Sequence, residues 1–151
     1  MLAEELREAY VQVGVRARDW RDAVRKALAP LVADGTVEDA YVDDVIRGAE
    51  ENGPYFVVTK GVAIPHARPE CGAHGQALGL TVLDRPVAFG SAANDPVRYL
   101  FPLSATSSQG HLEVLSSLVE VLADKRLYDL LDGAQSAREV VEGIRDIERS
   151  K

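Results

Sequence analysis

Short apolar runs in the middle of the chain, lying between segments of helical periodicity, constrain the fold most strongly. Each run is three to ten residues long, and turn-forming residues separate several of them; the runs are Tyr55–Val58, Val62–Ile64, Gln76–Leu83, Pro86–Phe89 and Pro96–Ala105. Runs that are apolar on both sides are typical of strands buried on both faces. The links are short enough for antiparallel as well as parallel pairs. We therefore predict an α/β fold in which a mixed β-sheet is sandwiched between α-helices.

The N-terminal third predicts a strand followed by two helices. Apolar and polar residues alternate over residues 10–16, as in a strand. Asp19 is placed to cap a helix, and Pro30 within that helical pattern predicts a kink or an early end. A second helix is expected from about Glu38 to Asn52, where Asn-Gly-Pro stops it.

The C-terminal third predicts helices only. Ser107 or Ser108 is placed to cap a helix that runs to about Ala123, and a shorter helix is expected over about 125–131. Ser136–Glu139 has the spacing of a capping box for a last helix. The residues expected to face inward on the first of these helices are Leu112, Leu115, Leu118, Val119 and Leu122.

Length and charge exclude several classes of protein. The chain has 151 residues, with 17 Lys and Arg against 24 Asp and Glu, so the net charge is −7. An acidic chain without a basic block is not expected to bind nucleic acid. The longest uncharged stretch, Tyr99–Leu112, is too short and too polar for a membrane span of about 20 apolar residues. The single cysteine cannot form an internal disulfide. We expect one cytoplasmic domain over residues 1–151, without membrane insertion.

Two histidines are the main candidates for chemistry, because the sequence contains no nucleotide-binding or hydrolase motif. His66 follows an apolar run that ends at Pro65, so it is expected at the end of a strand, where a loop begins. His111 is expected in the first turn of a helix, where free N–H groups favour an anion. Arg68 is close enough in sequence to help hold that anion.

The two histidines together suggest phosphoryl transfer. A neutral imidazole is a nucleophile that could take up a phosphoryl group and pass it on, while a second imidazole donates a hydrogen bond to the phosphoryl oxygens. Each histidine could equally be an unreactive loop or helix-start residue. No cofactor is expected for such a transfer.

Other candidate sites depend on fewer observations. His66, Cys71, His74 and His111 are residue types that bind zinc, but their spacing matches no standard zinc motif, and we expect no metal site. Cys71 and His74 most simply form an exposed loop pair, because a reactive thiol would need a nearby base. Residues 94–96, Asn-Asp-Pro, are most simply a turn, although Asn94 and Asp95 could line a cleft near His66.

Five segments carry a resemblance to a known family. They are Asp-Trp at 19–20, ENGPYFVV at 51–58, GVAIPHARPE at 61–70, NDPV at 94–97 and HLEVLSSLVEVL at 111–122. In this order they resemble the enzyme IIA subunits of the phosphotransferase system (PTS), in the mannitol/fructose superfamily, and most closely its ascorbate-type branch. The resemblance extends from about residue 19 to residue 144, and the family fold is a mixed sheet between helices.

The resemblance implies a specific reaction. His66 would accept a phosphoryl group, at Nε2, from the phosphocarrier protein HPr, which is supplied by enzyme I and phosphoenolpyruvate. His111 would support the phosphohistidine. A cysteine of a cognate IIB subunit would be the acceptor, and a membrane IIC subunit would deliver the sugar, L-ascorbate or a related compound. A homodimer is also compatible with the sequence.

One segment departs from the wider superfamily. Mannitol- and fructose-type members usually carry an arginine upstream of the phosphorylated histidine, whereas residues 48–55, GAEENGPY, contain none. No active-site arginine is therefore carried over from the resemblance.

The alternative function is a regulatory phosphoprotein, in which the phosphorylation state of His66 controls a binding partner.

Overall fold

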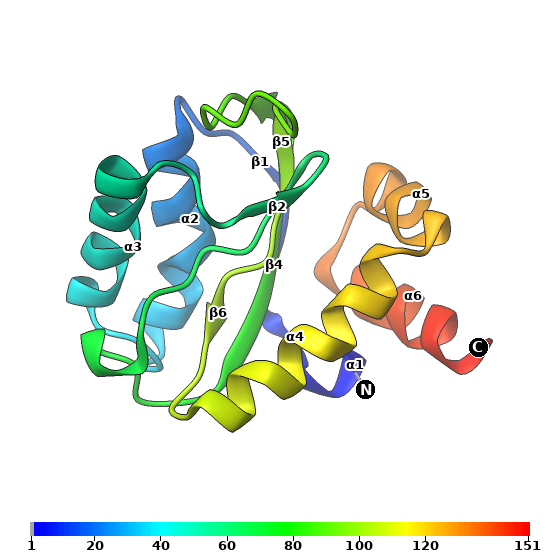
Figure 1. Ribbon diagram of the computed structural model, residues 1–151. Helices are drawn as coiled ribbons and strands as arrows, with labels where there is room; N and C mark the ends of the chain where they lie inside the picture. Colours follow the sequence, from blue (N-terminus) through cyan, green and yellow to red (C-terminus); the bar gives the residue numbers. More distant parts are fainter. Residues whose placement is uncertain (1) are drawn as a thin grey trace.

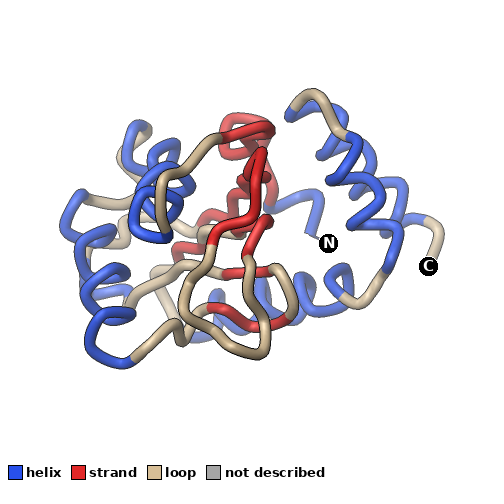
Figure 2. The backbone as a smooth tube through the Cα atoms, turned by 90° about the horizontal axis from the view of Figure 1, so that it is seen from above, coloured by secondary structure: helices blue, strands red, loops and turns tan. Residues whose placement is uncertain are grey.

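A mixed sheet with helices on both faces forms the core of the computed structural model, which describes residues 2–151. Figure 1 shows the sheet between α2 and α3 on one face and α4, α5 and α6 on the other, and Figure 2 shows the same layers from above. The strands are β1 (Leu6–Val15), β2 (Val57–Thr59), β3 (Val62–Ala63), β4 (Ala77–Val87), β5 (Val97–Leu100) and β6 (Leu103–Ser104). The helices are α1 (Leu2–Glu5), α2 (Trp20–Ala33), α3 (Asp39–Asn52), the 3₁₀ turn η1 (Pro69–Cys71), α4 (Ser108–Leu122), α5 (Lys125–Gly133) and α6 (Ala137–Arg149).

The sheet contains parallel and antiparallel pairs, as predicted. Its strand order is β1-β4-β5-β3-β2, and β6 pairs with β4 beside this path. The pairs β1–β4 and β3–β5 are parallel, whereas β4–β5, β2–β3 and β4–β6 are antiparallel. Because β3 is so short, the chain leaves the sheet just before His66, and this exit positions the candidate site.

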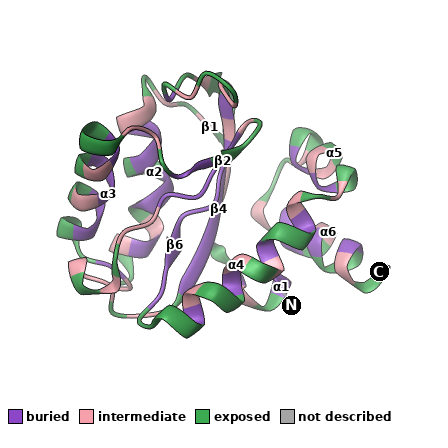
Figure 3. Cartoon of the chain, in the orientation of Figure 1, coloured by how far each residue is buried: buried purple, intermediate pink, exposed green. Residues whose placement is uncertain are grey.

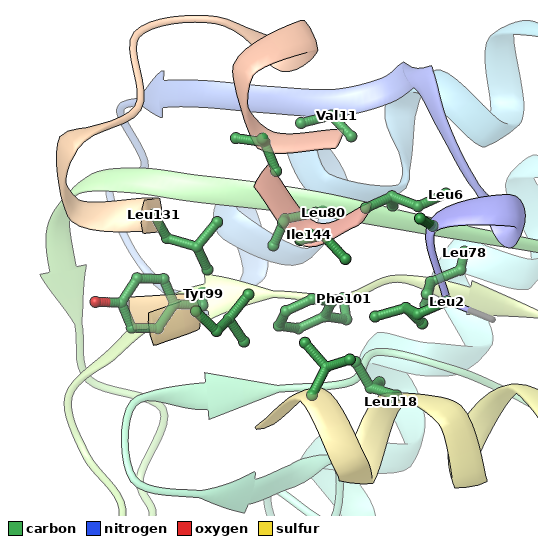
Figure 4. Close-up of a cluster of buried hydrophobic side chains, with 14 of the residues drawn as sticks. Leu2, Leu6, Val11, Leu78, Leu80, Tyr99, Phe101, Leu118, Leu131 and Ile144 are labelled. Atoms are coloured by element: carbon green, nitrogen blue, oxygen red, sulfur yellow. The ribbon is translucent and has the colours of Figure 1, made fainter. Parts of the chain in front are cut away.

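Two apolar cores lie on opposite faces of the sheet. The first packs α4, α5 and α6 against it, and Figure 4 shows its side chains, among them Leu80, Phe101 and Leu118. The second packs α2 and α3 against the other face, with Leu28 and Phe56 fully buried. In Figure 3 the buried residues gather on the sheet and on the helix faces turned toward it. Because helices cover both faces of the sheet, the strands consist of continuous apolar runs.

Side-chain caps set the starts of three helices, as the sequence predicts. Asp19 accepts a hydrogen bond from the N–H of Asp22, Ser107 accepts from Gly110, and Ser136 accepts from Glu139. Each cap satisfies an N–H group that the first helical turn leaves without a partner. The predicted stop of α3 is also confirmed, since the helix ends at Asn52.

Pro30 does not end α2 at once, because another residue replaces the donor that proline lacks. The helix continues to Ala33. The carbonyl of Lys26, which a residue at position 30 would normally bond, instead accepts a 2.8 Å hydrogen bond from Nε2 of Gln12 on β1. Gln12 also donates to Thr81 on β4 at 3.1 Å, so one side chain joins the sheet to the helix.

Several strand predictions are wrong in their boundaries, since β1 begins already at Leu6 and β2 only at Val57, and proline accounts for two others. No separate strand occupies residues 86–89; β4 runs through the expected turn to Val87. The pairing of β4 with β5 is irregular between Val82 and Val87, and this irregularity tolerates the missing N–H of Pro86. The expected strand over 96–105 is divided into β5 and β6, with Pro102 between them.

The expected inner face of α4 is wrong at two positions. Leu112 and Val119 are each 61% exposed, whereas Val114, Leu118 and Val121 are buried. The helix carries apolar residues around most of its circumference, and packing against α1, α5, α6 and the sheet selects the buried face.

The two ends of the described chain are held together. Glu148 of α6 accepts hydrogen bonds of 2.8 Å from the N–H groups of Leu2 and Ala3 in α1, a helix that the sequence did not predict. The carboxylate thus caps α1 from a residue at the far end of the chain. Among residues 2–151, no helix is long and apolar enough to cross a membrane.

Candidate active site

His66 lies where the chain leaves the sheet after β3. Ile64 still donates to the carbonyl of Phe56 at 2.7 Å, and the carbonyl of buried Pro65 accepts from Leu103 at 3.0 Å. These bonds hold the two residues that directly precede His66. His66 itself is half-buried, at the start of the loop that the sequence predicted.

The hydrogen bond of the His66 ring defines its tautomer. Nδ1 lies 2.6 Å from the carbonyl oxygen of Ile64. Because a carbonyl oxygen only accepts, Nδ1 must carry the hydrogen, and a neutral ring then has a free lone pair on Nε2. Burial lowers the pKa of His66, and nearby His111 acts in the same direction, although the Ile64 carbonyl opposes them. The neutral form is therefore favoured.

His111 lies beside His66, although the two are far apart in the sequence. The ring centroids are 5.2 Å apart, with an angle of 55° between the planes. His111 is in the first turn of α4, just after the Ser107 cap. A Cβ at Gly110 would lie 2.2 Å from Oε1 of Gln76, so the flexible Gln76 side chain packs into the space that this glycine leaves. The structure thus brings together the two histidines that the sequence singled out.

A cavity of about 740 Å³ opens beside the two rings. Ser107 and Ser108 at the N-terminus of α4 line one part of it, and Arg47 and Arg68 line another. Arg68 is exposed, as expected for a residue that could hold an anion, whereas Arg47 forms an ion pair with Asp44 at 2.8 Å. Histidines, hydroxyl groups, a helix N-terminus and guanidinium groups together suit a phosphoryl group.

The four potential zinc ligands do not form one cluster. Nε2 of His74 lies 2.6 Å from Oε2 of Glu38, and both side chains are exposed. Cys71 lines the cavity, but a hydrogen bond to the carboxylate of Asp44 raises the pKa of its thiol. Across residues 2–151, no three His, Cys, Asp or Glu side chains are arranged to hold a metal ion.

Asn94 and Asp95 do not line the cavity, contrary to the possibility raised from the sequence. The carboxylate of Asp95 accepts hydrogen bonds of 2.9 to 3.1 Å from the N–H groups of Phe89, Gly90 and Ser91. The carbonyl of Asn94 accepts from Gly61 at 2.9 Å. Both residues therefore fasten loops beside the sheet.

Three residues of the site were missed in the sequence. Arg47 directly precedes residues 48–55, and helical spacing from the other residues of α3 could have placed it on the exposed face. Tyr41 was interpreted only as an apolar residue of α3, and Tyr55 only as part of a strand. Each lies beside the His66 loop through tertiary contacts, for which the sequence contains no local signal.

Solved structures identify the fold as that of phosphotransferase-system IIA proteins. CmtB, the mannitol-specific cryptic phosphotransferase enzyme IIA of Escherichia coli, has a TM-score of 0.85 at 30% identity, over 96% of this chain and 98% of that one. IIA mannitol of Escherichia coli, solved in a complex with phosphorylated enzyme IIB mannitol, shares the fold at a TM-score of 0.79 and 24% identity, over 91% of this chain and 95% of that one. The predicted fold class is therefore confirmed.

Sequence comparison gives the family. The model described as "Phosphoenolpyruvate-dependent sugar phosphotransferase system, EIIA 2" matches residues 4–147. The ascorbate-specific PTS system EIIA component of Salmonella typhimurium is 34% identical over 135 residues, which cover 89% of this chain and 88% of that protein. The chain belongs to the EIIA 2 family of the sugar phosphotransferase system, as the resemblance of its segments predicted.

Proposed function

We propose that this chain is a IIA phosphocarrier and that His66 is its phosphorylated residue. The observation that carries the proposal is the 2.6 Å contact between Nδ1 of His66 and the Ile64 carbonyl, which leaves the lone pair of Nε2 free. His111 lies beside this ring, in a cavity large enough to admit part of another protein. A neutral imidazole held in this way is a nucleophile toward phosphorus.

The transfer consists of two displacements at phosphorus. In the first, Nε2 of His66 attacks the phosphoryl group of phosphorylated HPr, and the bond from phosphorus to the donor imidazole breaks, its electron pair leaving with that imidazole. In the second, the thiolate of a IIB cysteine attacks, and the bond between phosphorus and Nε2 breaks, its electron pair returning to His66. Positioning and charge stabilisation are the main requirements of such a transfer.

Charge stabilisation comes from three sources around the cavity. The N-terminus of α4 presents its first N–H groups and the hydroxyl of Ser108. Arg68 supplies a guanidinium group at the mouth. His111 donates a hydrogen bond to a phosphoryl oxygen, which stabilises both the transition state and the phosphohistidine.

Membership of the family supports a set of partners and a class of sugar. HPr is the donor, a cognate IIB subunit is the acceptor, and a membrane IIC subunit completes the transport of L-ascorbate or a related sugar. The chain works in the cytoplasm, as one domain that includes residues 1–151. A homodimer stays a prediction. Light scattering of the purified protein tests it by measuring the molar mass.

Phosphorylation by purified enzyme I, HPr and phosphoenolpyruvate tests the role of His66. Intact mass after an alkaline quench is expected to show one added phosphoryl group on the wild type. The same group is expected on the control His74→Ala, because His74 lies with Glu38 outside the cavity. No group is expected on His66→Ala, and His111→Ala is expected to be loaded about tenfold or more slowly. Labelling of His66→Ala would overturn the proposal.

A second experiment separates transport from regulation. Phosphorylated protein is mixed with the IIB subunit encoded nearest to it, and transfer to the IIB cysteine is followed by intact mass. Rapid transfer supports the transport role. Without transfer, phosphorylation-dependent capture of a regulatory protein would favour the alternative, in which the state of His66 controls a partner.

A further inference from the structure

We propose that Tyr55 is a positioning residue that fixes the His66 imidazole for phosphoryl transfer. The inference depends on the proposed function and adds a residue to it. The hydroxyl of Tyr55 donates a 2.5 Å hydrogen bond to the backbone carbonyl of His66. The Tyr55 ring also meets the His66 ring edge to face, with centroids 5.5 Å apart and an interplanar angle of 82°.

Tyr41 and Tyr55 hold the two polar atoms of one peptide group. Tyr55 bonds the carbonyl of His66, and the N–H of Ala67, on the other side of the same peptide bond, donates to the hydroxyl of Tyr41 at 3.0 Å. Tyr41 in turn donates to the carbonyl of Leu103 at 2.7 Å. Burial raises the pKa of Tyr41 to about 12, so its hydroxyl keeps the proton that this bond uses. The peptide plane after His66 is therefore held from both sides.

The Tyr55 contacts restrict the movements of His66 that would change the tautomer of its ring. Nδ1 reaches the carbonyl of Ile64, two residues back, only in the present position of His66 and the present orientation of its ring. Without the bond from the Tyr55 hydroxyl, the carbonyl and Cα of His66 can shift and the ring can turn away from Ile64, so the ring loses the bond that places the hydrogen on Nδ1. Nε2 then spends part of its time protonated and turned away from the cavity.

A glycine of α3 makes room for the Tyr55 ring. A Cβ at Gly48 would lie 3.3 Å from Cε1 of Tyr55 and 3.6 Å from its hydroxyl oxygen. Glycine inside a helix is destabilising relative to alanine, and Gly48 has an ordinary helical backbone that does not require glycine. Close approach of the Tyr55 ring to the helix is the structural reason for this glycine.

Tyr55→Phe tests the proposal, because it keeps the ring and removes only the hydroxyl. The rate of transfer from phosphorylated HPr at saturation is expected to fall about tenfold, with KM within about twofold. Nitrogen NMR of the His66 imidazole is expected to show the form with hydrogen on Nδ1 in the wild type. The same spectrum of Tyr55→Phe is expected to show a larger share of the form with hydrogen on Nε2.

Tyr128→Phe is the matched control. Tyr128 also donates to a backbone carbonyl, that of Leu122, at 2.6 Å, but it belongs to the α5–α6 side of the sheet. This variant is expected to change neither the transfer rate nor the His66 spectrum. Gly48→Ala disturbs the contact between Tyr55 and His66 from the side of α3. This variant is expected to slow transfer without lowering the melting temperature.

The outcomes separate this inference from the proposed function. Wild-type rate and spectrum in Tyr55→Phe would overturn the positioning role. A lower rate with an unchanged spectrum would also overturn it, because Tyr55 would then act on the partner protein and not on His66. If the wild type itself accepts no phosphoryl group, the proposed function fails, and the NMR comparison still decides whether Tyr55 orients the ring.

Discussion

At His66, one backbone carbonyl decides which ring nitrogen is available. The Ile64 oxygen takes the hydrogen of Nδ1, and this leaves Nε2 as the only nitrogen that can form a bond to phosphorus. Burial disfavours the charged ring, so both the tautomer and the protonation state favour nucleophilic attack. These two effects come from the local backbone and from packing, and neither requires a catalytic base.

The lowered pKa of His66 predicts the pH dependence of phosphorylation. The folded protein disfavours the proton on this ring, so the nucleophile is expected to be lost only as pH falls through a midpoint below about 6.5, the value of an unperturbed histidine. The same sign applies to stability, since the contribution of His66 is lost as pH falls below the unfolded value. NMR titration of the His66 ring gives the midpoint directly, and a midpoint above 6.5 would contradict the lowered pKa of His66.

Among the elements, α2 depends on a donor from outside the helix. Gln12→Ala leaves the Lys26 carbonyl without its bond from the protein and is expected to cost about 0.5–1.5 kcal/mol of unfolding free energy. In a Pro30→Ala background the helix supplies its own N–H to that carbonyl, so the cost of Gln12→Ala is expected to be smaller there.

Urea unfolding of the four proteins in this double-mutant cycle measures the coupling between Gln12 and Pro30. A positive coupling is expected. Equal costs of Gln12→Ala in the two backgrounds would mean that only the bond from Gln12 to Thr81 stabilises the protein.

Sequence patterns predicted those elements whose signals are local. The caps Asp19, Ser107 and Ser136 bond within three residues of themselves, so the starts of α2, α4 and α6 were predicted correctly. By contrast, the inner face of α4 depends on its packing against α1, α5, α6 and the sheet, and nothing in the local sequence indicates that Leu112 and Val119 are exposed.

The same limit holds for the candidate site. His66 and His111 were identified because each lies at the end of a local element, a strand and a helix start. Tyr41 and Tyr55 act through hydroxyl groups that reach another segment of the chain, and periodicity counts such residues only as apolar. Long-range hydrogen bonds of this kind follow from the fold and have no sequence pattern of their own.

At the scale of the molecule, the two cores share one sheet. β4 contributes Leu78 and Leu80 to the core under α4–α6, and Leu83 to the core under α2 and α3. Loss of either core removes support from the same strand, so we expect the chain to unfold in one cooperative step.

Two core variants test this cooperativity. Leu28→Ala and Leu118→Ala remove fully buried side chains from opposite faces, and each is expected to cost about 2–5 kcal/mol. Trp20 fluorescence reports on the α2 side, and far-ultraviolet circular dichroism reports on the whole chain. Coincident denaturation curves from the two probes are expected in both variants. Separate curves would mean that the two faces unfold independently.

The volume of the cavity beside His66 has a consequence for the order of events. A phosphoryl group fills only a small part of about 740 Å³, so the cavity also has room for a segment of a partner protein. If donor and acceptor both approach His66 through this opening, they exclude each other. Acceptor protein without a phosphoryl group then competes with phosphorylated donor protein for the cavity. The ratio of the two partners, as much as the chemistry at the ring, sets the rate at which phosphoryl groups pass through this protein.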